Sequence, residues 1–79
     1  MAHPPPWPAG REIAWTLGQA LRDCRLRVGV TQAEFASLLG VSERHLRRLE
    51  RGDCQPPYDV LLVATRRAGL RLRVVLEAS

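Results

Sequence analysis

The middle of the sequence carries two closely spaced helix-start signals, and these constrain the fold more than any other feature. Residues 31–34, with the sequence Thr-Gln-Ala-Glu, form a capping box. In this motif the threonine hydroxyl accepts a hydrogen bond from the glutamate amide, and the glutamate carboxylate accepts one from the threonine amide. Gly40 can adopt the left-handed conformation that closes a helix. The pattern predicts a short helix that begins at the threonine, ends at the glycine and turns Phe35, Leu38 and Leu39 inward.

The second signal is Ser42, a favourable N-cap residue, followed by Glu43 at the positive end of the new helix dipole. We expect this helix to run to about Arg51, because Gly52 then stops it. Two short helices joined by a turn of about three or four residues that contains glycine form a helix-turn-helix. The second helix would pack one side on the core and leave the other side polar and mainly positive. The inward residues would be Val41, Leu46 and Leu49, and the outward ones Glu43, Arg44, Arg47, Arg48 and Arg51.

A longer helix is predicted before this motif, and a tail before that helix. The apolar residues recur at the spacing of one helix face, at Ile13, Leu17, Leu21, Cys24 and Val28. The helix would begin near Arg11, and Gly29 would stop it. Four prolines among the first eight residues cannot support a helix or a central strand, so residues 1–10 are predicted to be a flexible tail.

The segment after the motif predicts a fourth helix and then a strand. The run from Tyr58 to Ala68 is apolar over most of its circumference, and Gly69 breaks it. Beyond the glycine, apolar residues alternate with period two, which predicts a strand over residues 70–77. One face of this strand would carry Leu70, Leu72, Val74 and Leu76. A lone strand leaves its backbone amides unpaired, so we expect it to pair antiparallel with its copy in a homodimer.

The predicted fold class is therefore all-α with one added strand. With 79 residues the chain can hold only one domain. Its parts would be the proline-rich tail over 1–10, a helix-turn-helix DNA-binding domain over 11–69 and the dimerisation strand over 70–77.

Composition limits the possible functions. The chain has 12 basic and 8 acidic residues, and every basic residue is arginine. Arginine pairs with phosphates and guanine edges through two-pronged hydrogen bonds, although a GC-rich genome produces the same bias.

No stretch is long and apolar enough to cross a membrane and no secretory signal is present, so we expect a cytoplasmic protein. Cys24 and Cys54 show no metal-ligand spacing, and nothing indicates a cofactor, a phosphate loop or a catalytic nucleophile; we expect no enzyme.

The two-helix motif and its flanks resemble a known family. The residues Thr31-Gln32-x-x-Phe35-Ala36-x-x-Leu39-Gly40-Val41-Ser42, followed by Leu46-x-x-Leu49-Glu50-x-Gly52, resemble the phage-repressor/Cro-like (XRE) helix-turn-helix family, with its lambda-repressor-like fold. The resemblance covers residues from about 17 to 69. The fourth helix that leads directly into an Arg/Leu/Val strand is similar to the HipB-like antitoxins of that family. The resemblance implies a dimer that binds operator DNA, holds a HipA-like serine/threonine kinase toxin and represses its own operon.

The resemblance also implies which residues would contact DNA. These are Gln32 at the start of the first helix of the motif, and Ser42, Glu43, Arg44 and Arg47 on the second. Gln32 would hold a phosphate at a helix N-terminus and brace the second helix. Arg44 and Arg47 would read bases, because a guanidinium can bond guanine O6 and N7 together. The remaining two outward arginines, Arg48 and Arg51, would contact phosphate or remain solvated.

The same comparison gives one further assignment, an ion pair, and one departure from the family, at Glu43. Arg25 and Glu50 correspond to the family's buried ion pair, which joins the long first helix to the second helix of the motif. Glu43 departs from the amide or basic residue that many relatives carry. It could accept a hydrogen bond from a cytosine amine, or it could stabilise the helix start and orient Arg44 or Arg47. His45 is expected to be partly packed.

Two alternatives to the antitoxin role remain open. A stand-alone or phage-type repressor without a toxin would use the strand for dimerisation alone. A pure protein-interaction module would have no affinity for a DNA duplex, even at low salt.

Overall fold

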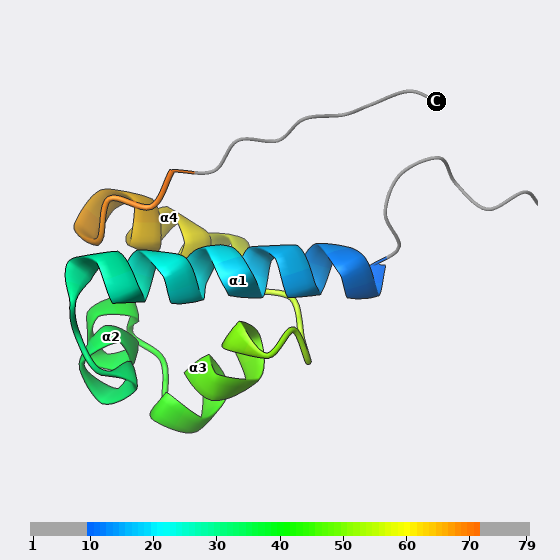
Figure 1. Ribbon diagram of the computed structural model, residues 1–79, viewed down its shortest axis with the longest axis horizontal. Helices are drawn as coiled ribbons and strands as arrows, with labels where there is room; N and C mark the ends of the chain where they lie inside the picture. Colours follow the sequence, from blue (N-terminus) through cyan, green and yellow to red (C-terminus); the bar gives the residue numbers. More distant parts are fainter. Residues whose placement is uncertain (1–9, 72–79) are drawn as a thin grey trace, which may run out of the picture.

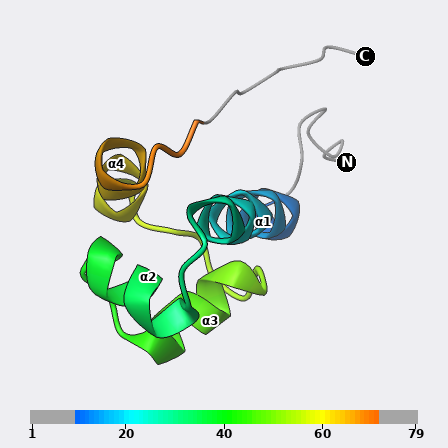
Figure 2. The same ribbon diagram turned by 60° about the vertical axis from the view of Figure 1, so that its left-hand side comes forward.

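The structure, a computed structural model, describes residues 10–71, which form four helices (Figure 1). Helix α1 spans Gly10–Val28, α2 Gln32–Leu39, α3 Glu43–Glu50 and α4 Tyr58–Arg67. The longest helix, α1, crosses the molecule, with α2 and α3 on one side of it and α4 on another (Figures 1 and 2). The four predicted helices are confirmed. Gly10, assigned to the tail from the sequence, is the first residue of α1.

The predicted caps of α2 are present. The Thr31 hydroxyl accepts from the amide of Glu34 at 3.1 Å, and the Glu34 carboxylate accepts from the amide of Thr31 at 3.0 Å. The hydrogen bond from the Thr31 amide lowers the pKa of the Glu34 carboxyl, and the Thr31 side chain adds to this effect. At the other end, Gly40 adopts φ 75°, and the amide of Val41 then reaches the carbonyl of Ala36 at 3.0 Å. The turn into α3 is closed by Ser42, whose hydroxyl accepts from the amide of His45 at 3.0 Å.

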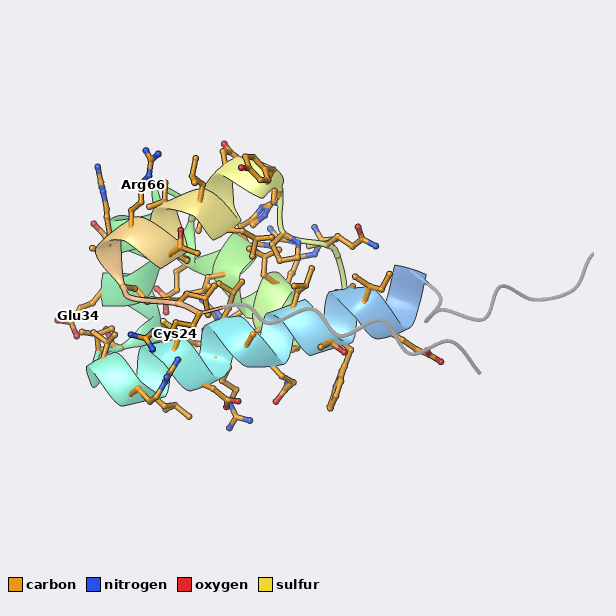
Figure 3. The ribbon with its side chains drawn as sticks, turned by 90° about the horizontal axis from the view of Figure 1, so that it is seen from above. Cys24, Glu34 and Arg66 are labelled. Carbon is orange, nitrogen blue, oxygen red and sulfur yellow. The ribbon has the colours of Figure 1, made fainter. Side chains whose placement is uncertain are left out.

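One cluster of buried side chains forms the core. Phe35 of α2 and Leu46 and Leu49 of α3 are fully buried at its centre. The other members are Leu21, Cys24, Ala36, Leu39, Val60, Ala64 and Leu70. Burial also raises the pKa of the Cys24 thiol, which lies on α1 (Figure 3) and donates to the carbonyl of Ala68 at 3.4 Å. Both cysteines are free thiols.

Two details of the expected packing differ. Ile13 and Val28, predicted to face inward, are 37% and 45% exposed. Ile13 lies in the N-terminal part of α1, the end that projects beyond the shorter helices (Figure 1), and Val28 is the last residue of α1. Leu70, placed in the dimerisation strand from the sequence, is not in a strand. It is buried in the core of its own chain, where its amide donates to the carbonyl of Ala64 at 3.1 Å.

Residues 72–77 of the predicted strand, including Leu72, Val74 and Leu76, lie outside the described residues, as does the tail before Gly10. Residues 10–71 contain no strand. No helix in this range is long and apolar enough to span a membrane.

A glycine sets the distance between α1 and α3. A Cβ atom on Gly18 would overlap the carbonyl oxygen of Leu49 and would lie 3.2 Å from that of Glu50. Because these are backbone atoms, a side chain at this position can be accommodated only if the two helices move apart. The backbones of α1 and α3 therefore approach as closely as they do because residue 18 has no side chain.

A buried ion pair joins the same two helices. Arg25 Nε donates to Glu50 Oε2 at 2.9 Å, and a terminal guanidinium nitrogen donates to Oε1 at 3.0 Å. The Glu50 side chain is 4% exposed and that of Arg25 13%. The hydrogen bond to Glu50 raises the pKa of the Arg25 guanidinium. The pair is two-pronged, so it fixes both the distance and the relative orientation of the helices.

We expect Gly18→Ala to destabilise the domain by about 1–3 kcal/mol, as overpacking does. In an open helix the same change stabilises by roughly 0.5–1 kcal/mol, so the sign of the effect tests the close approach. Denaturant unfolding measures it. Thr16→Ala, on the exposed surface of α1, is the control and should change stability by less than about 0.5 kcal/mol. A stabilised Gly18→Ala variant would contradict this packing.

We expect Glu50→Ala to cost about 3–5 kcal/mol, because it leaves the guanidinium of Arg25 buried without its partner. The double variant Arg25→Met/Glu50→Leu should lose less, since it removes both charges and restores apolar volume. Thermal unfolding followed by circular dichroism compares the two. A Glu50→Ala chain that melts at the temperature of the unaltered protein would show that the pair contributes nothing to stability.

Candidate nucleic-acid interface

Helix α3 divides into a packed face and a free face. Leu46, Leu49 and Glu50 are buried against the rest of the domain. The side chains on the opposite face are exposed: Glu43, Arg44, Arg47 and Arg48, continued past the helix end by Arg51. The free face therefore carries four arginines and a single acid.

The arginines of the free face surround a shallow hollow. Arg44, Arg47, Arg48 and Arg51 line a depression of about 510 Å³. Arg44 and Arg48 have no ion pair within residues 10–71, so their charges are not compensated by neighbours there. Four guanidinium groups around one concave surface produce a positive potential that attracts phosphate and other polyanions.

The two remaining arginines each face a carboxylate. Arg47 lies 3.6 Å from Glu43, one helical turn earlier, and both side chains are about half exposed. This contact favours the interpretation in which Glu43 orients Arg47. Arg51 lies 3.0 Å from Asp53 in the turn after α3. Exposed pairs of this kind contribute little to stability, and both arginines can exchange a carboxylate for a phosphate at small cost.

Gln32, at the first position of α2, does not lie free at the surface. Its side-chain amide donates to Glu50 Oε1 at 3.3 Å, on the same carboxylate that Arg25 holds. The side chain thus links the start of α2 to α3. The structure brings Gln32, Arg25 and Glu50 together, whereas Ser42 caps α3 and lies at its exposed N-terminal end.

Sequence reasoning missed a second amide at this junction. Gln19 of α1 donates to the backbone carbonyl of Glu50 at 3.3 Å and so satisfies one of the carbonyls left open at the end of α3. The available signal was the pair Gly18-Gln19, a small and a polar residue that interrupt the apolar run of α1.

His45 is half-buried beside the free face, as a partly packed residue would be, and its Nε2 atom has no hydrogen-bond partner in the described structure. Among the same residues, no group of three or more histidine, cysteine, aspartate or glutamate side chains could hold a metal ion.

Comparison with known proteins identifies the family. A family model described as a helix-turn-helix domain matches residues 16–78. No curated protein and no solved structure gives a match. The family match begins within α1 and contains the whole of α2, α3 and α4. Because it spans most of the chain, the protein belongs to this helix-turn-helix domain family, with α2 and α3 as the two helices of its DNA-binding motif.

Proposed function

We propose that the protein is a sequence-specific transcriptional repressor that inserts α3 into the major groove of operator DNA. The observation that carries the proposal is the division of α3. Buried Leu46, Leu49 and Glu50 fix its orientation, and exposed arginines cover its other side. A helix held in this way presents its side chains to base edges at a defined angle. The role is one of binding, not of catalysis.

The arginines of the free face would have different roles in DNA binding. Arg44 and Arg47 lie in the first two turns of α3 and would form two-pronged hydrogen bonds with guanine. Glu43 would hold Arg47 in the orientation that this contact needs. Ser42, at the N-terminal end of α3, would contact the sugar-phosphate backbone of the DNA. Arg48 and Arg51 would neutralise DNA phosphates. Gln32 would brace α3 through Glu50 and place the amide end of α2 near a phosphate.

The repressor would act as a homodimer. The apolar residues that alternate within residues 72–77, after the buried Leu70, support pairing of two such segments about a two-fold axis. Two copies of α3 spaced by about 34 Å would then read successive major grooves of a palindromic operator.

Within this role we propose a HipB-like antitoxin that represses its own operon and holds a HipA-like serine/threonine kinase toxin. The support is the sequence resemblance, in which a fourth helix leads through Gly69 into an Arg/Leu/Val segment. A stand-alone or phage-type repressor is the alternative, and it would share the DNA-binding surface.

Replacement of Arg44 by alanine should abolish the preference for guanine at one operator position and cost about 1–3 kcal/mol in specific binding. Selection from a random duplex library, followed by titration of the selected sequence, measures both effects. Arg66→Ala removes the same charge from α4 and should leave the preference intact. If the unaltered chain shows no affinity for any duplex at low salt, the protein is an interaction module instead.

Purification from cells that express the chain with its neighbouring genes tests the antitoxin role. We expect an untagged kinase-like protein to elute with the tagged chain as a stable complex. Isolation of the chain without such a protein, at physiological expression, would favour the stand-alone repressor.

A further inference from the structure

A second concave surface lies between α1 and α3, beside the hollow on the free face. It is an open groove of about 1020 Å³. Its walls come from α1, from the start of α2, and from α3 with the turn that follows it. The residues that line it include Trp15, Arg22, Gln32, Arg47, Glu50 and Arg51. Arg47 and Arg51 line both concave surfaces, so the groove continues the positive surface of α3 toward α1.

Arg22 is the lining residue whose charge is free. Arg25 is paired with Glu50, Arg47 faces Glu43, and Arg51 faces Asp53. Arg22 is exposed and has no ion pair with any residue between 10 and 71. An uncompensated guanidinium in a groove that continues a positive surface is suited to bind an anion.

The position of Arg22 along α1 places it on the side that faces α3. Gly18 and Gln19, one turn before it, contact the end of α3, and Arg25, one turn after it, pairs with Glu50. Residues at such spacings share one face of a helix. Arg22 therefore projects from a segment that is fixed on both sides by contacts with α3.

The turn after α3 is also packed against α1 at Trp15, another residue that lines the groove. A Cβ atom on Gly52 would lie 2.8 Å from the Cα atom of Trp15, so the turn after α3 packs directly on the backbone of α1. The Trp15 side chain is nevertheless 58% exposed. As an exposed residue that lines the groove, Trp15 can contact a ligand bound there.

The dimensions of DNA indicate which anion would occupy the groove. An α-helix with its side chains is about 10–12 Å wide, and the major groove is about 12 Å wide. A helix in the major groove therefore fills it, and the structural element beside that helix meets the sugar-phosphate backbone. Here the elements beside α3 are α1 and α2, and the groove between α1 and α3 is lined on one side by α1.

We propose that the groove between α1 and α3 holds the phosphate backbone of duplex DNA, with Arg22 of α1 as a phosphate ligand. This inference rests on the proposed insertion of α3 into the major groove. It assigns to α1 a direct part in binding, in addition to its packing role. Contacts to phosphate carry no base information, so Arg22 would add affinity without adding sequence preference.

The test is a titration of a short mixed-sequence duplex with the full chain and three variants, repeated between about 50 and about 200 mM salt. Arg22→Gln should weaken binding by about tenfold at the low-salt end. It should also reduce the slope of log affinity against log salt by about 0.9 per bound subunit. Arg22→Lys, which keeps the charge, should retain most of the slope.

The matched control is Arg66→Gln, which removes the same charge from an exposed position on α4, on the side away from α1 (Figure 3). We expect its affinity and slope to equal those of the unaltered chain. The thermal unfolding temperatures of Arg22→Gln and Arg66→Gln should be equal. Weaker DNA binding by Arg22→Gln would then reflect a lost contact with DNA and not a loss of folded structure. If both variants bind with the same affinity and slope while the unaltered chain binds DNA, Arg22 is not a phosphate ligand and the proposed function stands. If the unaltered chain does not bind any duplex, the proposed function itself fails, and this inference with it.

Discussion

The arrangement of α1, α2 and α3 depends on the hydrogen bonds that one buried residue, Glu50, accepts. It accepts two hydrogen bonds from Arg25 of α1 and one from Gln32 at the start of α2, while its own backbone carbonyl accepts from Gln19. A carboxylate that is 4% exposed is tolerated only if such partners replace its lost hydration. One residue of α3 thus requires three side chains from two other helices to be in place. The three donor side chains depend on Glu50 in turn, because its oxygen atoms orient them.

The hydrogen bonds at this junction specify the rotation of α3 more closely than apolar packing does. Burial of Leu46 and Leu49 holds α3 against the core, but the hydrophobic effect is nondirectional and specifies the rotation of a helix only loosely. The two-pronged contact with Arg25 is made in one orientation. At the same junction, Gly18 sets how near α1 can come. The rotation that these contacts fix decides which side chains of α3 face outward.

The parts of the fold that could be predicted from sequence are those governed by local chemistry. The capping box at residues 31–34, the glycine that ends α2 and the serine that starts α3 act within a few residues, so they mark helix ends directly. The family resemblance implied that Gln32 braces α3 but did not say through which residue, and the structure shows that its side-chain amide contacts Glu50, 18 positions away. The prediction for Leu70 was wrong for a different reason. Its alternating context indicated a strand, and only the path of the chain after Gly69 shows that it fills the core.

The candidate site is likewise a product of tertiary structure. Helix α3 has eight residues, and an isolated helix of that length is not stable in water. The three arginines of such a segment would repel one another and would adopt many conformations if the segment were free. The core fixes the backbone of α3, so the conformational entropy of that backbone is lost on folding, before any ligand binds. Since α1 provides Gly18, Gln19 and Arg25 to this framework, the longest helix determines how α3 presents its arginines to solvent.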